Sequence, residues 1–228
     1  MRLDGRVAIV TGASSGIGRA IALRFADEGA HVIAADLVRG PREGGPTTGE
    51  LLGERGTQID ADVSRAPDVD RLVAAALEHG RLDIFVANAA IAGAHSKPLL
   101  ETTEEDWDAI MAVNLRGVFL CARAAVGAML GQEPLGEARG RVILISSQHG
   151  MIGPPGHFAY AVSKGGLAQL TRSLAIELGP HNIQVNALAP GWVSTGTKAG
   201  AFAVAIRSAS MSSGNPITTG PGRPLVAV

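Results

Sequence analysis

The sequence has little of what marks secreted, nucleic-acid-binding or membrane proteins. It contains one cysteine in 228 residues, so no disulfide can form within the chain. It contains 20 lysines and arginines and 21 aspartates and glutamates, which gives a formal net charge of -1. The chain therefore has no excess of basic residues to bind nucleic-acid phosphates or an anionic membrane. No uninterrupted apolar run approaches the ~20 residues that cross a bilayer, and no signal-peptide pattern follows Met1. We therefore expect a cytoplasmic protein with neither a nucleic acid nor a membrane as partner.

The apolar residues that are present predict a doubly wound α/β fold with one parallel sheet. Short runs rich in valine and isoleucine alternate with segments of helical period, an order that favours βαβ crossovers. The chain is long enough for one sizeable core, so we expect a single domain over residues 1–228. Cys121 lies in an apolar helical pattern and is expected to be a small buried hydrophobe. The expected strands are 7–10, 31–35, 57–61, 84–87, 141–146 and 184–187, and the expected helices are 17–28, 68–79, 104–130 and 159–178.

Two stretches depart from this alternation. Residues 40–49 are rich in glycine and proline and are expected to form a mobile surface loop without regular structure. The segment 196–228 is an atypical C-terminal lid or edge segment. Its prolines at 216, 221 and 224 exclude a helix there and permit at most a short seventh strand, 225–228.

A glycine-rich turn, Thr11–Gly18, follows the first expected strand and opens a helix. Its spacing is G-x-x-x-G-x-G. Glycines permit positive φ and a close approach to a pyrophosphate, and the helix N-terminus offers unpaired N–H groups to phosphates. Asp36 closes the second strand eighteen positions after Gly18, where a carboxylate can accept bonds from ribose hydroxyls. It would repel a 2′-phosphate, so we expect a preference for NAD over NADP that the nearby Arg39 and Arg42 partly offset.

Tyr160 and Lys164 are spaced one helical turn apart, on one face of the last expected helix. An ammonium beside a phenol favours the phenolate, so we expect Lys164 to lower the pKa of Tyr160. The fifth strand ends in Ser146 and Ser147 at the edge of the sheet where open α/β folds bind ligands. Asn114 is a further polar residue in an apolar helix.

Together these features resemble the short-chain dehydrogenase/reductase family. The similarity runs from residue 3 to about residue 195 and covers the glycine turn, Asn114, the Ser147, Tyr160 and Lys164 set, and three short motifs: Asp62-Val63, Asn88-Ala89-Ala90, and Pro190 to Thr195. The resemblance implies a single Rossmann-like domain, a homodimer or homotetramer, an NAD or NADP cofactor and no metal. It also implies an oxidoreductase that moves a hydride between nicotinamide and a small secondary alcohol or ketone.

The resemblance implies a role for each matching residue. Tyr160 would exchange a proton with the substrate oxygen, Ser147 would orient that oxygen, Lys164 would tune Tyr160 and hold the nicotinamide ribose, and Asn114 would position a relay water. Ser146 is the less favoured alternative to Ser147. The cofactor would contact Gly12, Ser14, Ser15, Gly16, Ile17, Gly18, Asp36, Asp62, Val63, Asn88, Ala90, Tyr160, Lys164, Pro190, Gly191, Val193 and Thr195. His95, Gln148, His149, His157 and Trp192 are candidates to line the substrate pocket, although loop polarity or core packing also explains residues of these types.

The chain departs from the family at two places. Ala90 stands where glycine is usual, which is a mild change, and the lid and final strand after Thr195 are shortened. This shortening puts substrate closure and the tetramer contact in doubt. Two alternative functions remain: a 3-oxoacyl-thioester reductase that uses NADPH and an acidic carrier protein, against which Asp36 argues, and a non-enzymatic dinucleotide-binding regulatory or scaffold protein.

Overall fold

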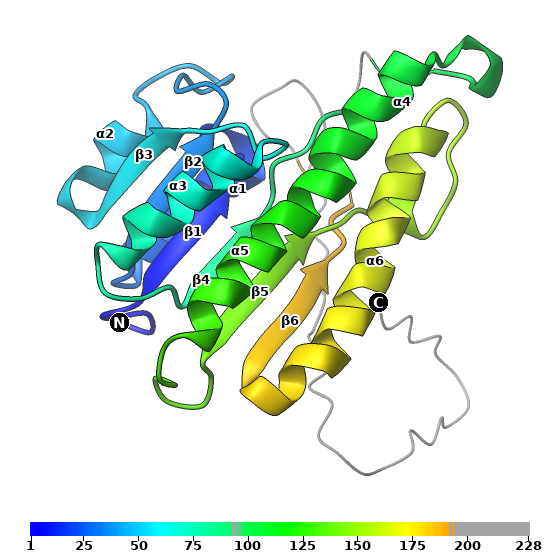
Figure 1. The fold of residues 1–228 in the computed structure, drawn as a ribbon. Coiled ribbons are helices and arrows are strands. Elements are labelled where there is room, and N and C mark those ends of the chain that lie inside the picture. Colours follow the sequence, from blue (N-terminus) through cyan, green and yellow to red (C-terminus); the bar gives the residue numbers. More distant parts are fainter. Residues whose placement is uncertain (93–94, 96, 192, 194–228) are drawn as a thin grey trace, which may run out of the picture.

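A six-stranded parallel sheet with helices on both faces forms the body of the computed structural model, which describes residues 1–92, 95, 97–191 and 193 (Figure 1). The strand order is β3-β2-β1-β4-β5-β6, and every neighbouring pair is parallel. The strands are β1 (Val7–Thr11), β2 (His31–Asp36), β3 (Gly56–Asp60), β4 (Ile84–Ala87), β5 (Gly140–Ile145) and β6 (Ile183–Leu188). The helices are α1 (Gly16–Asp27), α2 (Thr48–Leu52), α3 (Ala66–Leu77), α4 (Glu104–Met111), α5 (Val118–Leu130) and α6 (Phe158–Leu178). The predicted doubly wound fold is confirmed.

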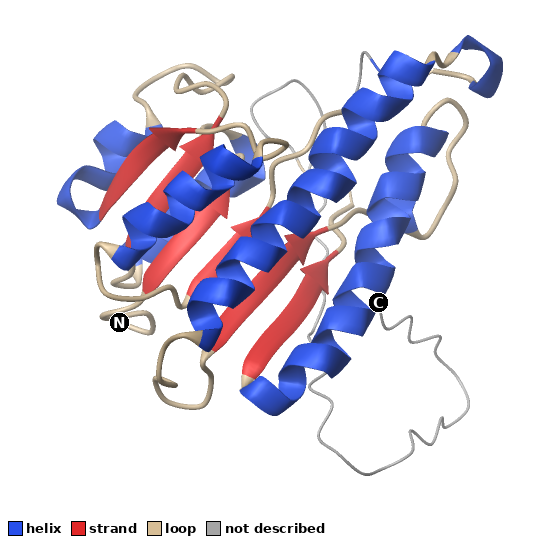
Figure 2. Cartoon of the chain, in the orientation of Figure 1, coloured by secondary structure: helices blue, strands red, loops and turns tan. Residues whose placement is uncertain are grey.

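Two apolar layers hold the sheet between its helices. On one face, residues of α3, α5 and α6 pack on alternate positions of the strands, among them Ile9, Phe85 and Leu144. On the other face, Ala22 and Ala26 of α1 pack on Ala8 and the opposite set of strand residues. Figure 2 shows the helices lying along the strands. Central strands are buried on both faces, which explains the unbroken apolar runs of the sequence.

The long helical region 104–130 is interrupted, contrary to the expectation of one regular helix. Between α4 and α5 the backbone widens into a π-helical turn, Ala112–Gly117. This turn carries Asn114, which is fully buried, and a widened turn is a common way to place a functional side chain. The region 104–130 is also long and apolar enough, by length and composition alone, to cross a membrane, a test that core helices of soluble proteins pass as well. Here α5 packs against α3, β4 and β5, as a core helix does.

The structure corrects the expectation for the loop 40–49 and confirms the expected burial of Cys121. The segment 40–49 is irregular only as far as Thr47, because Thr47 and Glu50 form a reciprocal capping box that starts α2 inside the predicted loop. Cys121 is buried as predicted, and desolvation raises the pKa of its thiol to about 12. The possible strand 225–228 and the rest of the C-terminal segment lie outside the described residues.

Candidate active site

The glycine turn lies at the carboxyl edge of the sheet and needs its glycines for space. Gly12 and Gly16 have positive φ values of 64° and 58°. A Cβ on Gly12 would lie 2.7 Å from Nδ2 of Asn88, and a Cβ on Gly18 would overlap the carbonyl oxygen of Gly12. Only a residue without a side chain fits these two approaches. The turn therefore has the tight backbone and open helix end that a dinucleotide pyrophosphate requires.

Asn88 holds this turn against the neighbouring strand. Its Nδ2 donates to the carbonyl oxygens of Thr11 (2.9 Å) and Gly12 (3.1 Å). The backbone N–H groups of Asn88 and Ala89 donate to Oγ1 of Thr11 at 3.0 and 3.1 Å. The side chain predicted to line the cofactor cleft thus fixes the shape of the cleft by joining β4 to the turn after β1.

Asp36 lies beside the glycine turn, as its position in the sequence predicts. Its Oδ2 accepts from the backbone N–H of Ser14 (2.9 Å), and its Oδ1 accepts from the N–H of Leu37 (2.8 Å). Arg39, which was expected to offset the charge of Asp36, is paired instead with Asp60, with 2.9 Å between Nε and Oδ1. Asp36 is thus bonded directly to the glycine turn, whereas Arg39 is paired with Asp60.

Glu43 was missed by the sequence analysis. Its Oε1 accepts from the backbone N–H of Gly16 (3.3 Å), the first residue of α1, and lies 3.9 Å from Nε of Arg19. A carboxylate at this helix end shows that the turn accepts an anion. The sequence does not predict this contact, because Glu43 and Gly16 are 27 residues apart and meet only when the loop after β2 folds against the start of α1.

The remaining predicted cofactor residues follow the same sheet edge. Asp62 accepts from the N–H and hydroxyl of Ser64 through Oδ1 at 2.9 and 2.7 Å, so part of its hydrogen-bonding capacity holds the turn after β3. Gln148 donates its backbone N–H to the carbonyl oxygen of Pro190 (3.1 Å), which joins the segments after β5 and β6. Ser15, Ile17, Ala90 and Gly191 are partly buried at these strand ends, Val63 is buried and Val193 is exposed. Thr195 and Trp192 lie outside the described residues.

Tyr160, Ser147 and Lys164 come together between β5 and α6. Ser147 is close enough to the phenol of Tyr160 to influence its pKa, and Nζ of Lys164 lies 5.6 Å from the centre of the Tyr160 ring. Nζ of Lys164 donates to the carbonyl oxygen of Ile145 (2.8 Å), and the residue is 2% exposed. Ser146 turns the other way and donates to the carbonyl oxygen of Lys164 (2.8 Å). Of the two serines, Ser147 is the one that meets the phenol.

Asn114 anchors the loop after β4 to this cluster. Its Oδ1 accepts from the N–H of Ile91 and its Nδ2 donates to the oxygen of the same residue, both at 2.8 Å. Its Nδ2 also lies 3.3 Å from Oγ of Ser163, the residue that precedes Lys164. Within the described residues Asn114 makes no direct bond to Lys164, so its link to the lysine runs through Ser163 and the helix backbone.

Burial shifts the ionisation of the phenol and of the amine in opposite directions. Desolvation raises the pKa of Tyr160 above its ordinary value of 10, and a hydrogen bond from Ser147 opposes this only in part. Desolvation lowers the pKa of Lys164 to about 8. The expectation that Lys164 lowers the pKa of Tyr160 is therefore not met in this arrangement. The reason is that the ammonium is directed to the Ile145 carbonyl while the phenol is partly buried.

The predicted pocket histidines separate into two groups. His149 lies edge-on to the Tyr160 ring with 5.9 Å between ring centres, and His157 lies 5.9 Å from His149. His95 instead lies beside Asp106 at the start of α4, with 3.1 Å from Nδ1 to Oδ1, and Lys97 donates to the same carboxylate at 2.6 Å. His95 thus fixes the loop after β4, whereas His149 and His157 flank the phenol.

Tyr160 is the single tyrosine of the chain, so its ionisation can be followed directly. We expect the phenolate absorption of the folded protein to appear with a pKa above 10, because burial disfavours the charged form. The Ser147→Ala variant should shift that pKa further upward. The measurement is an ultraviolet titration with circular dichroism to confirm that the protein stays folded. Phenolate formation below pH ~10 would mean that the Lys164 ammonium, and not burial, controls this group.

Comparisons with known proteins agree with this geometry. Residues 6–204 match the family model described as short chain dehydrogenase. The chain is 45% identical to a short-chain dehydrogenase/reductase of Armillaria gallica over 84% of this chain and 72% of the relative. It is 38% identical to the 3-oxoacyl-acyl-carrier-protein reductase of Thermotoga maritima over 86% and 77% of the two chains.

A solved structure shows the same fold. The crystal structure of a Sinorhizobium meliloti protein described as a short-chain alcohol dehydrogenase superposes with a TM-score of 0.76 at 37% identity, and the match covers 87% of this chain and 76% of that one. The predicted family is thereby confirmed. The chain belongs to the short-chain dehydrogenase family and is an oxidoreductase of the kind that acts on CH–OH and C=O groups with a nicotinamide dinucleotide.

Proposed function

We propose that this chain is an NAD(H)-dependent oxidoreductase that transfers a hydride between nicotinamide and the carbon of a small secondary alcohol or ketone. The observation that carries the proposal is that Ser147 and the buried Lys164 both lie beside Tyr160, at the carboxyl edge of the sheet. Ligands of open α/β sheets bind at this edge. The glycine turn opens onto the same edge, because β1 and β5 run parallel on either side of β4.

The residues of the cleft fit a dinucleotide. The turn from Gly12 to Gly18 leaves space for a pyrophosphate, and the N–H of Gly16 already receives an anionic oxygen from Glu43. Glu43 would give up this contact to the pyrophosphate. Asp36 would accept from the ribose hydroxyls, and Lys164 would hold the ribose next to the nicotinamide. The bound dinucleotide supplies or accepts the hydride.

Tyr160 is suited to donate a proton during carbonyl reduction. Its raised pKa keeps the phenol protonated at neutral pH, so it can deliver a proton from Oη to a carbonyl oxygen as negative charge develops there. Ser147 would donate a second hydrogen bond to the same oxygen and fix its position. Lys164, with a pKa of about 8, would return a proton towards the phenolate, and Asn114 would keep the neighbouring helix in place.

Charge at the far end of the cleft favours NAD over NADP. The carboxylate of Asp36 would lie against a 2′-phosphate, and Arg39 is occupied by Asp60. Arg42 is exposed and makes no ion pair with a described residue, so it can reduce the repulsion in part. The second candidate is a 3-oxoacyl-thioester reductase that uses NADPH, which is favoured by the identity to the Thermotoga maritima reductase. Turnover with the two cofactors separates the candidates.

The Tyr160→Phe variant tests the mechanism. We expect it to bind NADH as wild type does and to lose at least ~100-fold in kcat, because the proton donor is gone while the cofactor contacts remain. Turnover is measured with a panel of ketones and NADH, and binding is measured by nucleotide fluorescence. Wild-type turnover in this variant would remove Tyr160 from the mechanism. Absence of turnover by the wild type across the panel would contradict the proposed function itself.

The Asp36→Ser variant tests the cofactor preference. We expect its kcat/KM for NADPH to rise ~10-fold or more relative to that for NADH, since one repulsive charge contact is removed. The matched control is Asp27→Ser, which removes an exposed carboxylate at the end of α1 that is paired with Arg55. It should leave the ratio of kcat/KM for NADPH to that for NADH unchanged. A wild-type enzyme that already prefers NADPH would overturn the assignment of Asp36.

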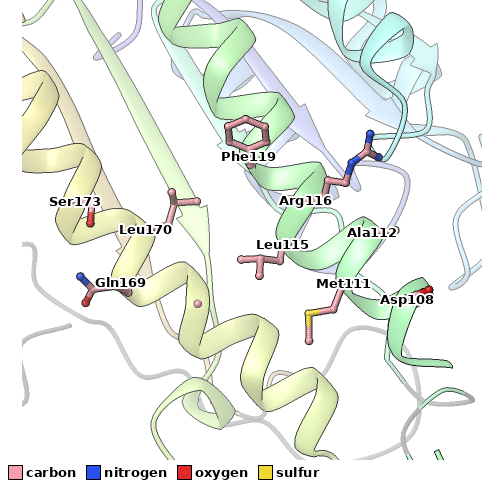
Figure 3. Close-up of a pocket in the computed structure, with 10 residues that line it drawn as sticks. Asp108, Met111, Ala112, Leu115, Arg116, Phe119, Gln169, Leu170 and Ser173 are labelled. Carbon is pink, nitrogen blue, oxygen red and sulfur yellow. The ribbon is translucent and has the colours of Figure 1, made fainter. Parts of the chain in front are cut away.

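We also propose that two copies of the chain associate through the outer faces of α4, α5 and α6. A groove of about 830 Å³ lies between these helices, and Met111, Leu115, Phe119 and Leu170 supply its apolar walls (Figure 3). Phe119 is 48% exposed, which is unusual for a large aromatic side chain. The groove lies on the outside of the helix layer, so it is not the catalytic cleft. Docking of a second copy would cover these side chains.

The mass of the protein in solution tests this association. We expect a dimer or tetramer for the wild type at micromolar concentration and a shift to monomer for Phe119→Asp, because an aspartate would be desolvated in the interface. Leu77→Asp, which changes a similarly exposed apolar residue on α3, is the control and should keep the wild-type mass. A wild-type monomer would contradict the proposal.

A further inference from the structure

Two histidines stand beside the reacting phenol and have no part in the mechanism above. His149 belongs to the short turn Gln148–Gly150 that follows β5, and its ring meets the Tyr160 ring at 88°. His157 precedes the first residue of α6, and its ring lies 5.9 Å from that of His149. The turn is held firmly, because a Cβ on Gly150 would lie 2.7 Å from the carbonyl carbon of Lys164. The two imidazoles are therefore placed by the same contact that places the phenol.

The surroundings of this pair contain few negative charges. Residues 138–191, all of which the structure describes, include one acidic residue, Glu177. Glu177 lies seventeen residues after Tyr160 on the same helix, which is about 25 Å at 1.5 Å per residue. The first turn of α6 has no acidic residue, and His157 makes no side-chain cap. The described residues that follow β5 thus place few carboxylates where they would repel a negative ligand.

The acidic start of α4 packs near this region, since Trp107 stacks on Phe158 with 5.9 Å between ring centres. Its buried carboxylate, Asp106, accepts from the Lys97 ammonium at 2.6 Å and lies 3.1 Å from Nδ1 of His95. Glu104, Glu105 and Asp108 are exposed, so solvent screens their charges. The acidic residues of α4 therefore add little negative charge at the histidine pair.

Two neighbouring imidazoles can bind one anion. Burial lowers the pKa of His149, and the neighbouring His157 lowers it further. A carboxylate between the rings would accept an N–H from each. No group of three or more metal-ligating side chains exists among the described residues, so the part of the chain that the structure describes does not point to a cation at this position.

We propose that the substrate carries a carboxylate within a few bonds of its reacting carbonyl carbon, and that His149 and His157 bind this carboxylate. The carbonyl oxygen would meet Tyr160 and Ser147 while the carboxylate meets the two imidazoles. The substrate class is then an oxo acid and its hydroxy acid product. This inference rests on the proposed function, because it names the substrate of the same site.

Matched pairs of acid and ester test the inference. The probes are acetoacetate with methyl acetoacetate and 2-oxobutanoate with its methyl ester, each reduced with NADH. We expect kcat/KM to favour the acid of at least one pair. In His149→Gln and His157→Gln, the ratio of acid to ester for that pair should fall ~10-fold or more, as when a charge-assisted hydrogen bond is lost. The ester alone should change by less than about threefold, because it lacks the charge.

The control is His181→Gln, which changes an exposed histidine at the opposite edge of the sheet and should keep the wild-type ratio. NADH binding is measured for every variant to show that the cleft remains folded. Reduction of the esters without a preference for either acid, or ratios that both glutamine variants leave unchanged, would overturn the inference and leave the proposed function standing. No turnover of either acid or ester by wild type would overturn both.

Discussion

The close contact between the end of β5 and helix α6 is the constraint on which the site depends. A side chain at Gly150 would collide with the backbone of Lys164, so the turn and the helix touch directly. Two hydrogen bonds join β5 to α6 along this contact, which we call the β5–α6 seam: the Ser146 hydroxyl donates to the carbonyl of Lys164, and the Lys164 ammonium donates to the carbonyl of Ile145. Ser147 and Tyr160 are neighbours because of this seam. Burial of the lysine and of the phenol follows from it as well.

This burial explains the electrostatic state of the site. Desolvation penalises charge on both groups, so the phenol is held protonated and the amine has a pKa of about 8. The Tyr160 phenol therefore holds a proton that it can donate to a carbonyl oxygen during reduction. At the other end of the cleft, carboxylates dominate: Asp36 lies beside the glycine turn and Glu43 lies at the start of α1. These carboxylates accept hydrogen bonds from backbone N–H groups of the glycine turn, which a pyrophosphate and a ribose would take over in part.

The sequence predicted the fold and the placement of Tyr160 beside Lys164 because both depend on short-range patterns. Buried parallel strands require unbroken apolar runs, and the i, i+4 spacing of Tyr160 and Lys164 fixes them on one helix face whatever the tertiary packing. Choosing Ser147 over Ser146 needed the family spacing, which the geometry agrees with. The π-helical turn at Asn114, the anchoring of Glu43 and the sign of the Tyr160 pKa shift depend on contacts between distant segments. No local pattern encodes those contacts.

A crystal structure of the protein with NADH tests the central claim most directly. The account predicts the nicotinamide ring beside Tyr160 and Ser147, the ribose hydroxyls on Lys164, and the pyrophosphate on the N–H of Gly16 with Glu43 withdrawn from it. Clear density for the nicotinamide away from the β5–α6 seam, with Tyr160 and Ser147 facing elsewhere, would contradict it.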